Sequence, residues 1–77
     1  MTHEVRFPVV STEPGATGIV ATWFSRDGER VTQGQVIAEL AVDKVSYDVE
    51  APAAGTLRTV VEEEAQVAQG DLIATIE

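Results

Sequence analysis

The second half of the chain repeats the pattern of the first half, and this duplication restricts the possible folds more than any other feature. Residues 18–20 (GIV) correspond to 55–57 (GTL), and residues 31–38 (VTQGQVIA) correspond to 67–74 (VAQGDLIA). The first match has an offset of 37 residues and the second an offset of 36, which predicts that the loop of the second half lacks one residue. Two units that cannot bury an apolar face alone stabilise each other by stacking. We therefore expect two stacked sheets related by a pseudo-two-fold axis, with few free edges.

Short strand patterns fill both halves. Six segments are rich in Val, Ile, Thr and aromatic residues and are bounded by Gly, Pro, Asp or Glu. These segments are 5–10, 18–24, 36–42, 45–51, 55–61 and 71–77, and two briefer strands are expected near Val31 and Val67. Residues 60–69 are good helix formers but lack an apolar stripe at helical spacing, so we interpret them as a strand end, a polar turn and a short strand. The pattern predicts an all-β fold, either a small sandwich or a flattened barrel.

Composition restricts the class of protein. The 77 residues fit one domain, 1–77, and the absence of cysteine excludes disulfides and thiolate metal sites. The formal net charge of −8 argues against nucleic acid and anionic membranes as partners, because both are bound through Lys and Arg. We find no apolar run that could span a membrane and no signal peptide, so the expected location is the bacterial cytoplasm or a mitochondrial matrix.

Several conspicuous residues have a purely structural interpretation. Gly34 and Gly70 each follow a polar pair and precede a strand, where a turn residue with positive φ is expected. Trp23 and Phe24 are interpreted as packing residues. The side chains expected in the core are Phe7, Ile37, Leu40, Leu57 and Ile73, and those expected on the solvated surface are Arg26, Arg30 and Arg58.

The only lysine of the chain, Lys44, lies between two alternating strand patterns. A two-residue turn at Asp43-Lys44 places six apolar residues on one face, in the pairs Val42–Val45, Leu40–Tyr47 and Ala38–Val49. The opposite face then carries Ala41, Ser46, Glu39 and Asp48. A slip of one residue would reverse both faces, so the register is well specified. This register puts Lys44 at a protruding tip and makes Glu39 and Asp48 direct neighbours, which costs some stability.

An exposed lysine at a hairpin tip is suited to covalent attachment rather than to catalysis. A solvated lysine amine is protonated at neutral pH and is a poor nucleophile, whereas catalytic lysines are usually buried. No arrangement of histidine, carboxylate and nucleophile is evident around His3, so we expect neither catalytic residues nor a metal site. With no competing lysine, a modifying enzyme would give one product. From the residues alone, an ordinary solvated turn lysine remains an equal alternative.

The sequence around Lys44 resembles the lipoyl domains of 2-oxo acid dehydrogenase complex acyltransferases. The resemblance rests on VDKV at 42–45 and APAAG at 51–55, and on the run GIVATWFSRDGERVTQGQVIAEL at 18–40. In that run Trp23 occupies the family's tryptophan position, and Val31 and Gly34 also fit. The resemblance spans nearly the whole chain. It implies two four-stranded antiparallel sheets in a flattened barrel or sandwich with pseudo-two-fold symmetry and the lysine hairpin at one end.

The resemblance also implies a function as a swinging-arm acyl carrier, with lipoate attached to Lys44 through an amide bond. The implied partners are a lipoate ligase or lipoyl transferase and a thiamine-diphosphate-dependent 2-oxo acid decarboxylase that reductively acylates the lipoyl group. Two further partners are implied: the acyltransferase core that transfers the acyl group to coenzyme A, and the flavin-dependent dihydrolipoamide dehydrogenase. The isolated domain is expected to be a monomer, excised from the N-terminus of a longer acyltransferase chain.

Four residues are candidates for the turn and for partner recognition. Asp43, beside the modified lysine, is expected either to contact the partners or only to shape the turn, and Val42 and Val45 flank it. The family loop before Gly18 usually reads Gly-Glu-x-x-x-Glu-Gly, whereas residues 12–18 here read TEPGATG. Glu13 matches and is expected to assist recognition. The departures at Thr12 and Thr17 leave the cognate decarboxylase open among those for pyruvate, 2-oxoglutarate, branched-chain 2-oxo acids and acetoin.

Three related families are alternatives. Biotinyl domains of carboxylases share the fold, but their tip usually reads Met-Lys-Met, whereas the only methionine here is Met1. Glycine-cleavage carrier proteins are normally larger. Unmodified lipoyl-like modules, as in membrane-fusion adaptors, usually lack a tip lysine or are interrupted there by a long insertion, and the intact VDKV hairpin argues against them.

Overall fold

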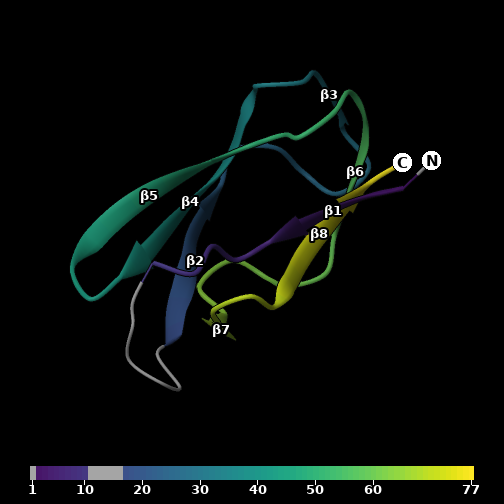
Figure 1. Ribbon diagram of the computed structural model, residues 1–77. Coiled ribbons are helices and arrows are strands. Elements are labelled where there is room, and N and C mark those ends of the chain that lie inside the picture. Colours follow the sequence, from purple (N-terminus) through teal and green to yellow (C-terminus); the bar gives the residue numbers. More distant parts are fainter. Residues whose placement is uncertain (1, 11–16) are drawn as a thin grey trace.

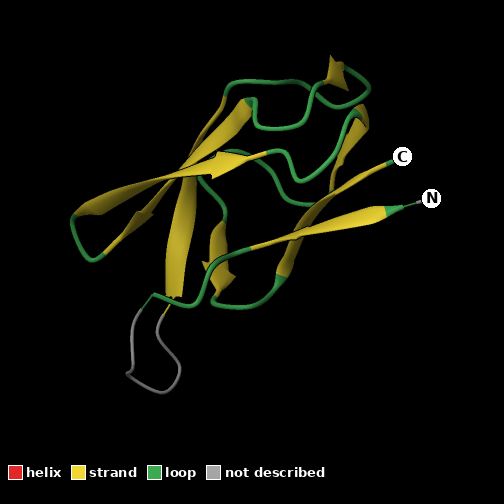
Figure 2. Cartoon of the chain, turned by 45° about the horizontal axis from the view of Figure 1, so that its top comes forward, coloured by secondary structure: helices red, strands yellow, loops and turns green. Residues whose placement is uncertain are grey.

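The computed structural model describes residues 2–10 and 17–77, and it folds into two stacked β-sheets (Figure 1). The strands, in chain order, are β1 (His3–Arg6), β2 (Thr17–Trp23), β3 (Arg30–Val31), β4 (Val36–Val42), β5 (Val45–Glu50), β6 (Gly55–Thr59), β7 (Gln66–Ala68) and β8 (Leu72–Ile76). The described part of the chain contains strands and loops only (Figure 2), so none of its segments is a helix long and apolar enough to cross a membrane. The predicted all-β class is confirmed.

The two sheets are equivalent when the two halves of the chain are exchanged, so that β1–β4 take the places of β5–β8 and the reverse. One sheet has the strand order β1-β8-β6-β3 and the other the order β5-β4-β2-β7, all antiparallel. Replacing each strand by the one four places along the chain converts the first order into the second. Because no pairing between the described strands joins the two sheets, the fold is a sandwich rather than a closed barrel. The order of the strands in the two sheets therefore has the predicted pseudo-two-fold symmetry.

The same exchange places the lysine hairpin and the chain ends at opposite ends of the molecule. The turn that joins β4 to β5 corresponds, after the exchange, to the position between β8 and β1, where the chain is open. Figure 1 shows the β4–β5 hairpin projecting on one side and the N and C ends close together on the other. The described fold therefore presents the hairpin away from its two ends.

The extra residue of the first half lies in a strand and not in a loop. In the pairing of β2 with β4, Val20 faces Leu40 but Thr22 faces Glu39, so Ala21 is a β-bulge. The equivalent pairing of β6 with β8 runs without interruption. The sequence prediction that a loop lacks one residue is therefore wrong. The spacing of the flanking glycines shows that the first half has one extra residue between them, but it does not show at which position.

The core lies between the sheets and contains the side chains that the alternation predicts. All five predicted core residues are at most 1% exposed: Phe7, Ile37, Leu40, Leu57 and Ile73. Trp23 packs against this core, and its Nε1 donates to the carbonyl of Val61 at 3.2 Å. Phe24 was predicted to pack as well, but it is 55% exposed. Successive side chains of an extended chain point to opposite sides, so only one of this adjacent pair can face the core.

Five of the six predicted strand segments have different ends in the structure, and two of them differ by more than one residue. The first was expected at 5–10, but β1 ends at Arg6, because Pro8 has no N–H to donate to a sheet. The segment 55–61 forms a strand only as far as Thr59.

Residues 60–69 contain no helix, as predicted, and include only the short strand β7. Gly34 and Gly70 have the expected positive φ, 85° and 86°.

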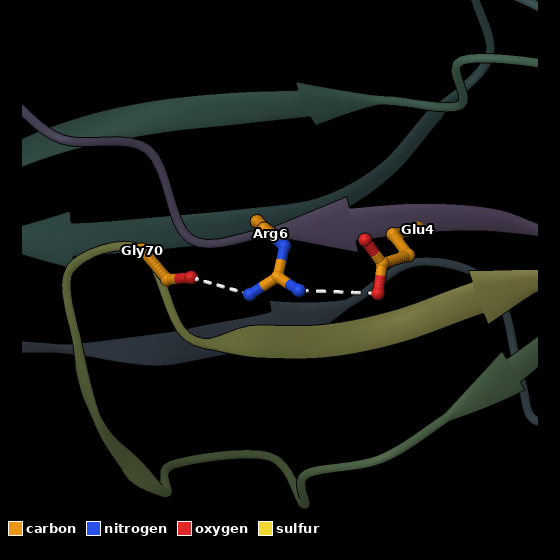
Figure 3. A network of polar contacts seen from close by, with 3 residues as sticks. All are labelled: Glu4, Arg6 and Gly70. Atoms are coloured by element: carbon orange, nitrogen blue, oxygen red, sulfur yellow. Dashed lines mark hydrogen bonds and ion pairs between the residues drawn. The ribbon is translucent and has the colours of Figure 1, made fainter.

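All four arginine side chains lie on the surface, and two of them form ion pairs. Figure 3 shows Arg6 between two partners: its Nη1 donates to the carbonyl of Gly70 at 2.9 Å and its Nη2 lies 3.1 Å from Glu4 Oε2. Arg58 pairs with Glu77 at 3.2 Å. Both ion pairs are about half exposed, and such pairs stabilise a protein only slightly. Arg26, Arg30 and Arg58 are exposed, as predicted.

A glycine permits the close packing of three segments beside the lysine hairpin. A Cβ atom at Gly18 would lie 2.5 Å from Cζ of Phe7 and 2.6 Å from the carbonyl oxygen of Ala41. Both neighbours are held by the core or by the sheet, so neither can move away without disturbing it.

We expect Gly18→Ala to lower the free energy of unfolding by about 1–3 kcal/mol, the usual cost of overpacking. Urea unfolding followed by Trp23 fluorescence measures the change. Ser46→Ala, at an exposed position on β5, is the control and should change stability little. Equal stability of the two variants would contradict the close packing around Gly18.

Candidate functional site

The hairpin of β4 and β5 has the register that the sequence predicts. Val42 pairs with Val45, and the ladder continues through Leu40–Tyr47 to Ala38–Val49. Asp43 and Lys44 are the two turn residues between the strands. Figure 1 shows this turn at the free end of the projecting β4–β5 hairpin. Lys44 therefore lies at the tip, where the hydrophobic pattern places it.

The turn has a backbone conformation that usually requires glycine. The φ angles of Asp43 and Lys44 are 49° and 69°. Positive φ at both central residues is the requirement of a type I′ turn, whose twist matches that of the flanking strands. A left-handed conformation costs a residue other than glycine about 1–2 kcal/mol, although aspartate tolerates it better than most. Such a conformation persists only where the surrounding structure imposes it. The ladder of β4 and β5 therefore holds Lys44 in a defined backbone geometry.

The side chains at the tip are accessible. Asp43 and Lys44 are both exposed, and neither has a hydrogen bond or an ion pair with any residue that the structure describes. Val42 is only 6% exposed, as predicted. Val45 was predicted to be buried with it but is 49% exposed. Val45 begins β5, the edge strand of its sheet, next to the turn, and no other strand of residues 2–10 and 17–77 pairs with β5 on its outer side.

Buried side chains support the base of the hairpin. A Cβ atom at Gly18 would lie 2.5 Å from Phe7 Cζ and 2.8 Å from Val42 Cγ2, so these three residues meet beneath the turn. Phe7 comes from the segment after β1 and Gly18 from β2, far from the hairpin in sequence. The sequence pattern marks Phe7 only as a core residue and does not predict that it supports the hairpin. Its one sequence signal is the glycine shared by both repeats at 18 and 55.

One predicted site residue lies outside the described part of the chain, and that part holds no cluster of metal-ligating side chains. Glu13 lies outside the described residues, so its predicted part in recognition stays a prediction. Among residues 2–10 and 17–77, no group of three or more His, Cys, Asp or Glu side chains could hold a metal ion. His3 is exposed on β1, at the end that carries the chain termini.

Comparisons with known proteins agree with this geometry. Residues 3–76 match the family model described as "Biotin-requiring enzyme". A dihydrolipoyllysine-residue succinyltransferase component of a 2-oxoglutarate dehydrogenase complex from Bacillus subtilis is 32% identical over 95% of this chain and 18% of its own length. A dihydrolipoyllysine-residue acetyltransferase component of a pyruvate dehydrogenase complex from Rickettsia felis is 39% identical over 79% of this chain and 15% of its own. The chain thus spans less than a fifth of these curated relatives.

A solved structure is similar to this chain in its fold as well as in its sequence. The lipoyl domain of the 2-oxoglutarate dehydrogenase complex from Azotobacter vinelandii has a TM-score of 0.81 and 32% identity to this chain. The match covers 97% of this chain and 95% of that domain. The likeness therefore extends over the entire sandwich and is not limited to the hairpin.

The positive φ of Asp43 gives a direct test of the turn. We expect Asp43→Val to lower the free energy of unfolding by about 1–2 kcal/mol, because a β-branched side chain is disfavoured in the left-handed region. The matched control is Asp48→Val, which places the same side chain on the strand β5, where valine is favoured. Thermal unfolding of both variants measures the difference. A greater loss in the strand variant than in the turn variant would exclude the type I′ geometry.

Proposed function

The chain belongs to the family of biotin- and lipoyl-attachment domains, and we propose that it is a lipoyl carrier domain in which Lys44 is the attachment site. One observation supports this most strongly. The only lysine of the chain is exposed, unpaired among the described residues, and held at positive φ on the tip of a supported hairpin. A solvated lysine needs no such backbone geometry, whereas an attachment point gains from a fixed position.

The residues at the tip fit an attached lipoate. Its carboxyl group would form an amide with Nζ of Lys44, with loss of water and of the positive charge. That reaction requires an amine free of competing contacts, as the exposed side chain provides. The bound group supplies a redox-active disulfide ring that accepts and releases acyl groups.

The domain itself contributes position rather than catalytic groups. Val42, Phe7 and Gly18 hold the base of the hairpin, and the β4–β5 ladder fixes the turn. A group attached to the tip extends away from the sandwich and can reach separate active sites while it remains linked to one chain. Such a linkage raises the effective concentration of the group at each site, which replaces diffusion between enzymes.

Lipoate is favoured over biotin, the other group that this family attaches. Asp43 and Val45 flank the lysine, whereas the tip of biotinyl domains usually carries methionines. The relatives are named for a dihydrolipoyllysine residue, and the matching solved structure is a lipoyl domain. These names describe the relatives, and the attachment to this chain is our proposal.

The proposed partners follow from that role. They are a lipoate ligase or lipoyl transferase, a thiamine-diphosphate-dependent 2-oxo acid decarboxylase, an acyltransferase core and a flavin-dependent dihydrolipoamide dehydrogenase. The relatives come from complexes for 2-oxoglutarate and for pyruvate, so the similarity leaves the 2-oxo acid open. The proposed location is the bacterial cytoplasm or a mitochondrial matrix.

Intact-mass spectrometry tests the attachment. Protein from cells that supply lipoate, or protein treated with purified lipoate ligase, should carry the mass increment of one lipoyl amide. Lys44→Ala should carry none. A biotin increment instead, or the lipoyl increment in Lys44→Ala as well, would exclude the proposed site or group.

The structure offers a matched control for position. Glu64 is exposed, lies in another turn, and has a φ of 69°, the same value as Lys44. In the double variant Lys44→Ala/Glu64→Lys, a lysine occupies an equivalent backbone conformation outside the β4–β5 hairpin. We expect no lipoyl increment on this variant, because the ligase needs the hairpin and not only an exposed amine. Full loading would show that the hairpin is not recognised.

Asp43 is proposed to contact the enzymes that act at the tip. We expect Asp43→Ala to slow reductive acylation of the loaded domain more than it harms folding. Acylation rates with decarboxylases for pyruvate and for 2-oxoglutarate, measured beside the thermal midpoint, separate the two effects. A large loss of thermal stability with normal acylation would limit Asp43 to shaping the turn.

A further inference from the structure

The hairpin that carries Lys44 contains a pair of like charges with no compensating partner in the part of the chain that the structure describes. Glu39 on β4 and Asp48 on β5 are direct cross-strand neighbours. Like charges in this position destabilise a sheet. Neither carboxylate has a hydrogen bond or an ion pair with any residue that the structure describes. The pair therefore weakens the hairpin without a benefit inside the described domain, and local costs of this kind are typical of functional surfaces.

Basic residues are absent from the sheet that holds this pair. Its strands β5, β4, β2 and β7, all fully described, contain no Lys or Arg. The strands of the other sheet carry Arg6, Arg30 and Arg58. The two outer faces of the sandwich therefore differ in charge, and the acidic one belongs to the sheet from which Lys44 projects.

A row of three uncharged side chains separates the acidic pair from the tip. Ile19, Ala41 and Ser46 are successive cross-strand neighbours on β2, β4 and β5. Ala41 lies two residues from Glu39, so the row shares the outer face with the acidic pair. Ile19 is 37% exposed. A patch of small or apolar side chains with charges at its rim is typical of a protein–protein interface.

The size of an interface determines whether a partner at the tip also reaches the acidic pair. The Glu39–Asp48 pair lies three residue pairs from Val42–Val45, which is about 10 Å along the strands. An interface of standard size covers about 800 Å² on each partner, which is a disc with a radius of roughly 16 Å. A protein that binds the hairpin from this face therefore covers both carboxylates.

Covering these carboxylates selects the partner by charge. Removing water from a charged group is costly unless an opposite charge replaces the water. A partner with a neutral or acidic surface meets this cost in full, whereas a basic side chain between the two carboxylates offsets it. Specificity then arises from a penalty against unsuitable partners as well as from attraction to the right one.

We propose that the outer face formed by Ile19, Ala41 and Ser46, with Glu39 and Asp48 at its rim, is the docking surface for the 2-oxo acid decarboxylase. The carboxylate pair receives an arginine or lysine side chain of that enzyme. This inference rests on the proposed function, because it requires that the enzyme acts at Lys44. Amide formation at Lys44 changes the formal net charge from −8 to −8 − 1 = −9, so the loaded domain attracts a basic surface more strongly than the unloaded one.

The test compares two double variants with the same change in charge. Glu39→Gln/Asp48→Asn removes the acidic pair, and Glu62→Gln/Glu64→Gln removes two exposed acids from the turn before β7. Each protein is loaded by lipoate ligase, and loading is checked by intact mass. The readout is kcat/KM of reductive acylation, at low and at high salt, by the decarboxylases of a pyruvate and of a 2-oxoglutarate complex.

Loss of the acidic pair should lower kcat/KM by about tenfold, as expected for the loss of an interfacial charge contact, and should weaken its dependence on salt. The Glu62/Glu64 control should stay within about twofold of the parent protein, since electrostatic steering depends on where charge lies. The thermal midpoint of the Glu39/Asp48 variant should stay equal or rise, because a like-charge repulsion is removed. The single variants Glu39→Gln and Asp48→Asn should give intermediate losses.

Other results overturn the inference in ways that can be told apart. Equal kcat/KM and equal salt dependence in both double variants would exclude the docking surface and leave the carrier function intact. Slower loading with normal acylation would assign the surface to the lipoate-attaching enzyme instead. A parent protein that is not loaded at Lys44, or that is loaded but acylated by none of the decarboxylases for pyruvate, 2-oxoglutarate, branched-chain 2-oxo acids and acetoin, would exclude the proposed function itself.

Discussion

The pairing register of β4 with β5 is the constraint on which the rest of the structure depends. Leu40 and Val42 are buried because they point toward the other sheet, and this orientation requires the turn to fall at Asp43 and Lys44. A register shift of one residue would expose these side chains and bury Glu39 and Ala41 in their place. Burial of apolar side chains therefore fixes the position of a residue that is itself fully outside the core.

The duplicated architecture explains how so small a chain supports a projecting hairpin. Each half closes a turn against the other: the amide of Gly28 donates to the carbonyl of Leu57, and the amide of Glu64 donates to the carbonyl of Val20. Carboxylates at equivalent positions repeat this exchange, since Asp27 accepts from the amide of Thr59 and Glu63 from that of Trp23, both at 2.9 Å. Neither half can form these contacts alone, so the sandwich folds as one unit.

The pseudo-two-fold symmetry of the fold does not extend to the β4–β5 turn, which carries the proposed attachment site. The two halves share their core positions and turn glycines, but the chain joins β4 to β5 and leaves β8 and β1 unjoined. The joining turn thus has no counterpart in the described fold. It carries the only lysine and two residues at positive φ, and its strands carry two neighbouring carboxylates that have no partner among the described residues. These features cost stability or leave it unchanged, which is expected where a surface is shaped for partners rather than for folding.

The sequence by itself determined the strand segments, the duplication, the five core residues and the register that places Lys44 at a tip. It could do so because alternation of apolar side chains is a local property of the chain, and a repeated pattern implies a repeated structure. The tertiary structure alone decided the bulge at Ala21, the positive φ of Asp43 and Lys44, the exposure of Phe24 and Val45, and the contact of Phe7 with Gly18 beneath the hairpin. Each of these depends on which segments meet in space: a bulge is defined by a partner strand, and burial by what covers a side chain. The pattern along a chain specifies which way a residue points, but only the packed sheets specify what it meets there.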